Sequence, residues 1–296
     1  MSANKMIKFV TVLVLIFLLV ACSAPTASTP TPAPIVTQVL VATPLPIPAV
    51  ATATPTIAPT PTAWVTASPN NDPAIVPILM YHHLEDLPQD ASELRRTWTV
   101  APKTFESQIE WLAQRGFHTI TMAQLVAHLK QRQPLPSKPI VISFDDGWAD
   151  AYTVAYPILK KHGFIGTFFI YTNPIDHKLY VTWTQLEEMS SAGMDIQGHT
   201  LSHPHLRTLE PEAAMKEIVD SKAILEKRLG KPIVALAYPD GEYNNAIIDM
   251  VKRAGYESAV TLAAGYRQRP DELFTLHRIR VSYGDSLQDF ANRLPQ

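Results

Sequence analysis

Strand-like and helix-like patterns alternate along residues 74–296, and this alternation constrains the fold more than any other feature of the chain. The strand-like runs are short, apolar and rich in β-branched residues, whereas the segments between most of them show helical spacing. Phe105, Ile109 and Leu112, for example, recur at the spacing of one helix face. The alternation predicts one α/β domain, either a barrel or a doubly wound sheet. The strand-like runs are Val76–Tyr81, Ile140–Phe144, Thr167–Tyr171, Met194–Gln197, Ile233–Tyr238, Ser258–Thr261 and Phe274–Val281.

Three helix boundaries carry local signals. A long helix is expected over Pro211–Gly230, because proline favours the first position of a helix and glycine the position just after its end. Thr184 with Glu187, and Asp285 with Gln288, have the spacing of a capping box. These two pairs predict where two further helices begin.

Polar, chemically useful side chains follow the strand-like runs. In βα barrels the carboxyl ends of the strands converge on one face, and active sites lie there. We therefore expect residues that are far apart in the sequence to share one pocket. The side chains concerned are His82 and His83 after the first run, Asp145 and Asp146 after the second, His199 after the fourth, and Asp240 with Gly241 after the fifth.

Two of these segments together could form a metal site. Asp145 and Asp146 repel each other, so a cation or a proton must offset them if both are buried, although a solvated Asp-Gly turn is the alternative. His199 and His203 are four residues apart and could hold one cation, unless both are simply surface histidines. Thr200 stands where a zinc protease motif has its glutamate, so a base and a third ligand must come from elsewhere. The acid pair could supply both and leave an open coordination position, as in a catalytic zinc site.

The chain resembles the polysaccharide deacetylases, carbohydrate esterase family four, in the branch of the poly-N-acetylglucosamine deacetylases. The resemblance covers roughly residues 76–282, with the motifs in the expected order. It implies a distorted (β/α) barrel, a divalent metal (most often zinc, with cobalt, nickel or manganese as alternatives), and removal of acetyl groups from N-acetylated or O-acetylated sugars. The matching segments are Pro77–His83, Ser143–Gly147, His199–His203, Ala237–Gly241 and Arg278–Ile279.

The resemblance also implies roles for individual residues. Asp146, His199 and His203 would hold the metal, and Asp145 would be the general base that takes a proton from the metal-bound water as it attacks the acetyl carbonyl. The metal and a backbone N–H at Asp240 would hold the resulting oxyanion.

A general acid must then protonate the departing amine. Leu276–His277 is similar to the motif that supplies this acid in many members of the family. In the branch named above the histidine comes instead from the N-terminal strand, which favours His82 over His277, with His83 as a further candidate.

Two positions depart from the family pattern. Ala237 stands where many members have an arginine that steadies the base, and Arg278 or Arg280 could replace it from a neighbouring strand. Gly198 stands where serine or asparagine usually precedes the first metal-binding histidine.

The first 73 residues differ in composition from the rest. Residues 1–21 have a positive start and a short apolar run, Phe9–Ala21, which is shorter than the roughly 20 residues that span a bilayer. The string Leu19–Cys22 resembles a bacterial lipobox, so we expect a lipoprotein signal peptide and lipidation of Cys22, with a plain signal peptide as the alternative. Residues 22–73 are rich in threonine, proline and alanine and predict a disordered linker.

Together these features predict an extracytoplasmic, lipid-anchored monomer that faces the cell wall or periplasm. It would deacetylate an N-acetylated wall or matrix polysaccharide, with an O-acetyl ester deacetylase or an inactive carbohydrate-binding lipoprotein as alternatives. The net charge of −2 argues against a nucleic-acid partner, and the single cysteine excludes an internal disulfide. Trp98, Trp148 and Trp183 either line a sugar groove or belong to the core.

Overall fold

The computed structural model describes residues 72–295. The expected signal peptide (1–21), the lipidation site Cys22 and all but the end of the expected linker lie outside the described residues, so these features stay predictions. Among the residues that are described, no helix combines the length and the hydropathy needed to cross a membrane.

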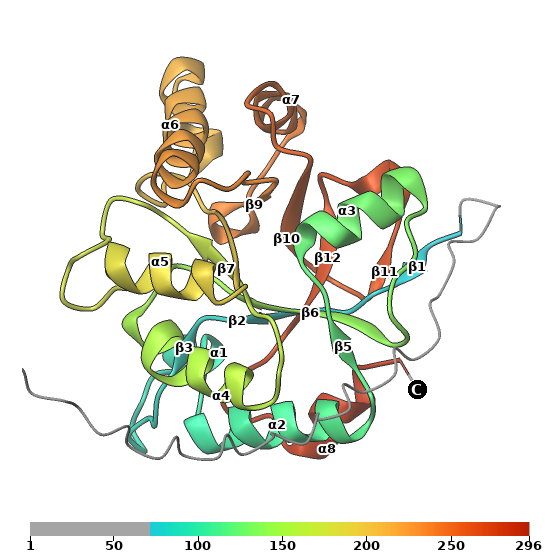
Figure 1. Ribbon diagram of the computed structural model, residues 1–296. Coiled ribbons are helices and arrows are strands. Elements are labelled where there is room, and N and C mark those ends of the chain that lie inside the picture. The colour runs from blue at the N-terminus through green and yellow to red at the C-terminus, as the bar shows by residue number, and fades with distance from the viewer. Residues whose placement is uncertain (1–71, 296) are drawn as a thin grey trace, which may run out of the picture. The chain divides into compact units, whose positions relative to one another are not determined.

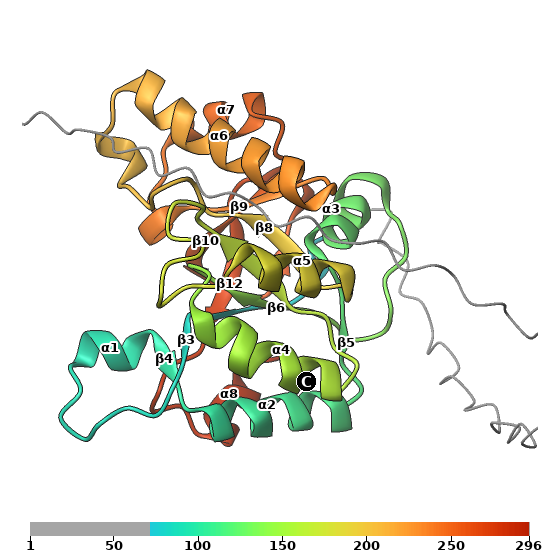
Figure 2. The same ribbon diagram turned by 60° about the vertical axis from the view of Figure 1, so that its left-hand side comes forward.

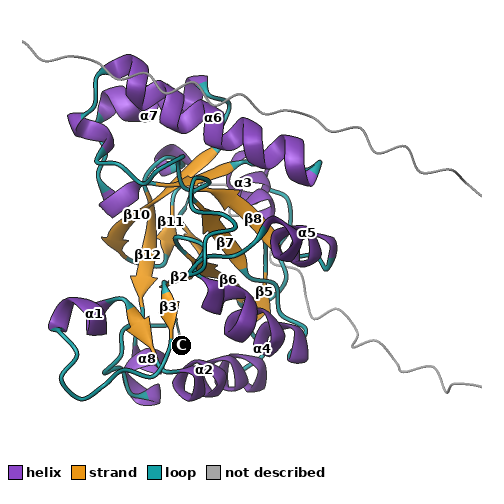
Figure 3. Ribbon diagram, turned by 90° about the vertical axis from the view of Figure 1, so that its left-hand side faces the viewer, coloured by secondary structure: helices purple, strands orange, loops and turns teal. Residues whose placement is uncertain are grey.

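Seven parallel strands of the described chain close into a barrel, as Figures 1 and 3 show. The strand order is β2-β12-β10-β9-β8-β7-β6, and β6 pairs again with β2 to complete the circle. Each of the seven expected strand-like runs overlaps one of these strands, so the predicted distorted (β/α) barrel is confirmed. The strands are β2 (Ile78–Tyr81), β6 (Pro139–Phe144), β7 (Thr167–Ile170), β8 (Asp195–Gly198), β9 (Ala235–Ala237), β10 (Ser258–Ala264) and β12 (Leu276–Arg280).

The apolar composition of these strands explains the closed barrel. Every residue of β2, β6, β7 and β9 is buried, including those that alternate to the outer face. Strands that are apolar on both faces are typical of a parallel sheet whose outer face is covered by helices. The barrel therefore has a packed interior and a packed exterior.

Within residues 72–295, five short strands lie outside the closed barrel. The β1 strand pairs antiparallel with β11, β3 pairs with β4, and β5 extends the sheet beside β6. The sequence did not predict them, because two residues are too few to show a period. Their bounds are β1 (Ala74–Ile75), β3 (His83–Leu84), β4 (Thr99–Val100), β5 (His118–Thr119) and β11 (Arg267–Gln268).

Helices surround the strands, and Figure 2 shows α1 standing apart from the others beside β3 and β4. On α2 the apolar face predicted from Phe105, Ile109 and Leu112 is fully buried. A five-residue π-helical segment (Ala151–Ala155) precedes α4. The helices are α1 (Glu93–Thr97), α2 (Pro102–Gln114), α3 (Met122–Gln131), α4 (Tyr156–Lys161), α5 (Trp183–Ser191), α6 (Pro211–Leu229), α7 (Asn245–Arg253) and α8 (Leu287–Asn292).

The long helix α6 begins at Pro211 and ends before Gly230, which has a left-handed φ of 64°, as predicted. Both predicted capping boxes are wrong. The box of α5 joins Thr182 with Gln185, and that of α8 joins Ser286 with Asp289. In each helix the capping residue has an extended backbone, which aims its hydroxyl at the free amides of the first turn.

Candidate active site at the carboxyl end of the barrel

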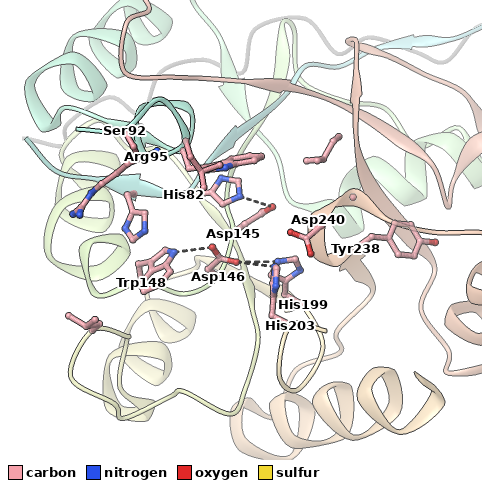
Figure 4. Close-up of a pocket in the computed structure, with 16 residues that line it drawn as sticks. His82, Ser92, Arg95, Asp145, Asp146, Trp148, His199, His203, Tyr238 and Asp240 are labelled. Carbon is pink, nitrogen blue, oxygen red and sulfur yellow. Dashed lines mark hydrogen bonds and ion pairs between the residues drawn. The ribbon is translucent and has the colours of Figure 1, made fainter. Parts of the chain in front are cut away.

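A cavity of about 500 Å³ lies where the carboxyl ends of the strands converge. Figure 4 shows side chains from the ends of β2, β6 and β8 pointing toward one another inside it. The structure thus brings together the residues that the sequence predicted to share a pocket. They are His82, His83, Asp145, Asp146, His199, His203, Asp240 and Gly241.

One carboxylate and two imidazoles face a common point. The ligand atoms of Asp146, His199 and His203 all lie within 4.8 Å of one another. Oδ1 of Asp146 is 3.3 Å from Nε2 of His199 and 3.6 Å from Nε2 of His203. This oxygen is buried and has no hydrogen-bond partner among the described residues, whereas Oδ2 accepts a 2.9 Å hydrogen bond from Nε1 of Trp148. A buried, unpartnered carboxylate oxygen between two imidazoles is the arrangement expected of a site that takes a cation.

The backbone fixes the protonation of the first histidine. Nδ1 of His199 is 2.7 Å from the carbonyl oxygen of Ala237, and a carbonyl only accepts hydrogen bonds. Nδ1 therefore carries the hydrogen, and Nε2 faces Asp146. Metal-binding histidines are oriented in the same way by a partner on the other ring nitrogen.

Neighbouring charges control the pKa of Asp146. Burial by itself raises this pKa, but the contact with His199 and the electrostatic interactions with His82, His199 and His203 outweigh it and hold the pKa below its usual range. For His199 burial lowers the pKa, while Asp146 and Asp145 raise it above the ordinary value. The site therefore holds an ionised carboxylate and attracts positive charge.

Asp145, next to the cluster, forms a bidentate ion pair. Nη1 and Nη2 of Arg278 donate to its two carboxylate oxygens at 2.7 and 2.8 Å, and Nε of Arg278 donates to the carbonyl of Thr261. Both Asp145 and Arg278 are buried. Burial raises the pKa of Asp145, but the Arg278 guanidinium outweighs this effect and holds the pKa below its usual value. Of the two arginines considered from the sequence, Arg278 thus contacts this carboxylate, whereas Arg280 stacks on Trp98 at 4.3 Å.

His82 lies beside this carboxylate. Its Nε2 lies 3.8 Å from Oδ2 of Asp145, and its ring centroid is 4.5 Å from that of Trp98. Burial lowers the pKa of His82, and the carboxylates of Asp145 and Asp146 oppose this shift. His82 is therefore placed to exchange a proton with a group bound in the cavity.

The other two candidate histidines are placed differently. His83 lines the cavity, but its Nδ1 is 3.3 Å from Oδ2 of Asp150 and its ring lies tilted against Trp148, with the ring centroids 4.2 Å apart. His277 does not line the cavity, and its backbone amide donates to Gln268. His82 and His83 therefore line the cavity, and His277 is not among the lining residues.

Asp240 occupies the predicted position at the cavity wall (Figure 4). It has a left-handed φ of 53° within the short turn Pro239–Gly241, which gives the backbone a sharp bend there. Its carboxylate is 3.3 Å from Nδ1 of His205.

Steric crowding explains why position 198 is a glycine. A Cβ added to Gly198 would collide with the hydroxyl of Tyr256, a side chain that is itself buried. The buried ring of Tyr256 therefore leaves no room for a side chain at this position.

Two of the three tryptophans considered for a sugar groove line the cavity. Trp98 and Trp148 are in the lining, but Trp183 is not, because it lies at the start of α5 with Arg228 stacked on its ring at 5.2 Å. Trp148 also donates a hydrogen bond to Asp146 and stacks on Tyr180 at 4.4 Å, and neither contact was predicted from the sequence. The Asp-x-Trp spacing in this strand-end loop was the available signal.

Comparisons with known proteins agree with this geometry. The family profile described as "Polysaccharide deacetylase" matches residues 132–259. The Bacillus subtilis (strain 168) protein named "Putative polysaccharide deacetylase YxkH" is 34% identical over 230 residues, which cover 78% of this chain and 78% of that protein. The chain belongs to the polysaccharide deacetylase family.

Two further relatives extend the comparison. The "Poly-beta-1,6-N-acetyl-D-glucosamine N-deacetylase" of Staphylococcus epidermidis is 29% identical over 201 residues, which cover 63% of this chain and 69% of the relative. Among solved structures, the Streptococcus pyogenes deacetylase PplD in complex with acetate is 30% identical, with a TM-score of 0.71. The match covers 76% of this chain and 100% of that structure.

Proposed function

We propose that this chain is a metal-dependent hydrolase that removes acetyl groups from N-acetylated sugars of a cell-wall or matrix polysaccharide. The observation that carries the proposal is the position of the Asp145–Arg278 pair beside the Asp146, His199 and His203 cluster in one cavity. Family membership supports the reaction class, deacetylation of a polysaccharide.

The residues present fit a divalent metal. Two imidazole nitrogens and one carboxylate oxygen are a ligand set of catalytic zinc sites, and they leave a position open for water or substrate. Asp146, His199 and His203 would hold the ion through Oδ1 and the two Nε2 atoms. A divalent ion bound there supplies Lewis-acid polarisation of the acetyl carbonyl and acidifies water. Zinc is our first choice, and cobalt, nickel or manganese also suit these ligands.

Asp145 is the proposed general base. Its bidentate pair with Arg278 keeps it ionised and fixes the plane of the carboxylate. An ionised carboxylate at this position can take a proton from the water that attacks the acetyl carbonyl. The backbone N–H of Asp240 would then donate to the oxyanion that forms at the carbonyl oxygen.

His82 is the proposed general acid. The leaving group of an acetamide is an amine nitrogen, which departs only when it is protonated. His82 lines the cavity at 3.8 Å from Asp145, so the proton donor and the base would lie on the same side of the cluster. His83, oriented by Asp150, is the second candidate for this role.

Two alternatives use the same cavity. An O-acetyl ester, as in acetylated xylan, would need the same metal and base. It would need less help from an acid, because an alkoxide is a better leaving group than the nitrogen anion of an amine. An inactive carbohydrate-binding lipoprotein would have no use for a buried carboxylate with a bidentate arginine. The name of the Staphylococcus epidermidis relative, an N-deacetylase of poly-β-1,6-N-acetyl-D-glucosamine, supports the amide substrate.

We also propose an extracytoplasmic location with a lipid anchor at Cys22. The support is the sequence pattern of residues 1–22 and the polymeric substrates named for the relatives. The Thr/Pro/Ala-rich residues 22–73 would then separate the catalytic domain (74–296) from the membrane.

Acetate release tests the proposed reaction. The full chain is incubated with a panel of N-acetylated glycans and one acetyl ester, with zinc or cobalt and with a chelator. We expect chelator-sensitive release from an N-acetylated glycan. Asp145→Asn should lose activity by about 10²- to 10⁴-fold and still bind one metal ion per chain. Release that persists in the chelator, or full activity of Asp145→Asn, would refute the mechanism.

A further inference from the structure

Glu217, a residue of α6, reaches the turn that carries both histidines of the metal cluster. Its Oε2 accepts hydrogen bonds from the backbone amides of Leu201 and Ser202, each at 2.9 Å. Its Oε1 accepts a third, at 2.7 Å, from the hydroxyl of Ser202. One carboxylate thus makes three contacts with Leu201 and Ser202, two of the three residues between His199 and His203.

The turn needs such a partner because its own backbone is strained. Thr200 and His203 both have left-handed φ values, 70° and 58°, which are unfavourable for residues other than glycine. Inside the turn, the hydroxyl of Thr200 accepts a 3.1 Å bond from the amide of His203. A strained turn keeps its shape only when the surrounding structure fixes it.

The opposite side of the turn is also fixed. The carbonyls of Thr200 and Leu201 accept hydrogen bonds from the amides of Thr172 and Asn173, at 3.2 and 2.8 Å. These bonds are between backbone atoms and would form with almost any side chains. On the α6 side, by contrast, the hydrogen bonds to the turn among residues 72–295 come from a single side chain, Glu217.

We propose that Glu217 is a positioning residue that holds His199 and His203 in the geometry required to bind one divalent ion. The inference rests on the metal site of the proposed function and concerns a residue outside the cavity lining. Glu217 acts only through the amides and hydroxyl of the turn. Partners of this kind orient metal ligands, and their loss typically weakens metal affinity by about 10- to 100-fold.

Zinc affinity of the full chain, measured by competition with a chromophoric chelator, tests the inference. Glu217→Ala removes all three contacts and should weaken zinc binding by about 10- to 100-fold. Glu217→Gln keeps an acceptor oxygen for the two amides, so we expect it to recover most of the affinity. Visible absorption of the cobalt-loaded protein gives a second readout, since a change in ligand geometry alters the spectrum.

Glu212→Ala is the matched control. Glu212 is an exposed glutamate in the first turn of the same helix, so this variant makes the same change in charge without touching the turn. Ser202→Ala removes only the hydroxyl contact and gives a milder variant if Glu217→Ala folds poorly. In a Glu217→Ala background, Ser202→Ala should have little further effect, because the two residues act through one contact.

The outcomes separate this inference from the metal site itself. The inference would be overturned if Glu217→Ala and Glu212→Ala bound zinc with equal affinity, whether or not that affinity were weaker than that of the unaltered chain. If His203→Ala binds zinc as well as the unaltered chain, the proposed metal site is wrong and the inference falls with it. If zinc binding depends on His203 but not on Glu217, only the inference is wrong.

Discussion

Replacement of Arg278 by methionine should destabilise the domain and inactivate the site together. Methionine has a similar length and an apolar stem, so Arg278→Met removes the charge and the hydrogen bonds with little change in volume. The buried carboxylate of Asp145 then loses both of its bidentate bonds, at 2.7 and 2.8 Å. Asp145 would be left as an uncompensated buried charge or would take up a proton, and neither form serves as an oriented base.

The geometry sets the size of the effect. Both side chains of the pair are almost fully buried, with 1% of Arg278 and 3% of Asp145 exposed, so solvent replaces the lost contacts only poorly. Removal of one partner from such a pair costs about 3 to 5 kcal/mol of folding free energy. In a domain of this size 1 kcal/mol shifts Tm by about 2 to 4 °C, so we expect Tm to fall by about 6 to 20 °C.

Urea unfolding followed by circular dichroism measures this loss. The unfolding is done in chelator, because bound metal would add its own binding free energy to the folded state. The same series includes Asp145→Asn and the double variant that combines Arg278→Met with Asp145→Asn. Removal of both partners should cost less than the sum of the single changes, by about 1 to 3 kcal/mol, because no unpaired charge remains.

Arg280→Met is the matched control on the same strand. Arg280 stacks on Trp98 and is more exposed than Arg278, so its loss should cost about 1 kcal/mol or less. The reasoning would be refuted if Arg278→Met and Arg280→Met were equally stable. It would also be refuted if the losses of folding free energy in Arg278→Met and Asp145→Asn simply added up in the double variant.

Three further predictions concern the site. Asp146→Asn should bind zinc about 10-fold or more weakly in equilibrium dialysis, and unchanged metal content would remove it from the ligand set. His82→Gln should lower the rate of acetate release by about 10²- to 10⁴-fold while His277→Ala leaves it unchanged, and the reverse result would reassign the acid. Gly198→Ala should destabilise the domain by about 1 to 3 kcal/mol in urea unfolding, because its Cβ meets the hydroxyl of Tyr256. Tyr256→Phe should reduce that loss, and no reduction would show that the clash lies elsewhere.

The barrel strands could be predicted because burial on both faces leaves continuous apolar runs. The run Ile140–Phe144, for example, falls within β6, which is buried at every position. The two-residue strands could not be predicted, since they are defined by pairing partners rather than by their own composition. The capping pairs failed for a related reason. The choice between neighbouring polar residues depends on which one has an extended backbone, and the spacing of side chains does not show this.

The candidate site could be predicted where its residues directly follow strands. Asp145 and His199 follow buried strands, so the convergence of parallel strands brought them together. The choice between Arg278 and Arg280 could not be made, because alternation places both on one face of β12 and only the position along the strand decides which one reaches Asp145. Glu217 gave no signal at all, since its role depends on how α6 packs beside the histidine turn.

The closure of the barrel also determines when the site can exist during folding. The β2 strand, which precedes His82, is held between β6 and β12, and β12 lies near the far end of the chain. Arg278 is 133 residues from the carboxylate that it holds. A chain whose synthesis or folding has not reached β12 therefore has an open sheet, with unpaired edges on β2 and β10 that invite association with other chains. Pairing between such distant strands is slow, so catalytic competence and protection of these edges should arise together, at the last step of folding.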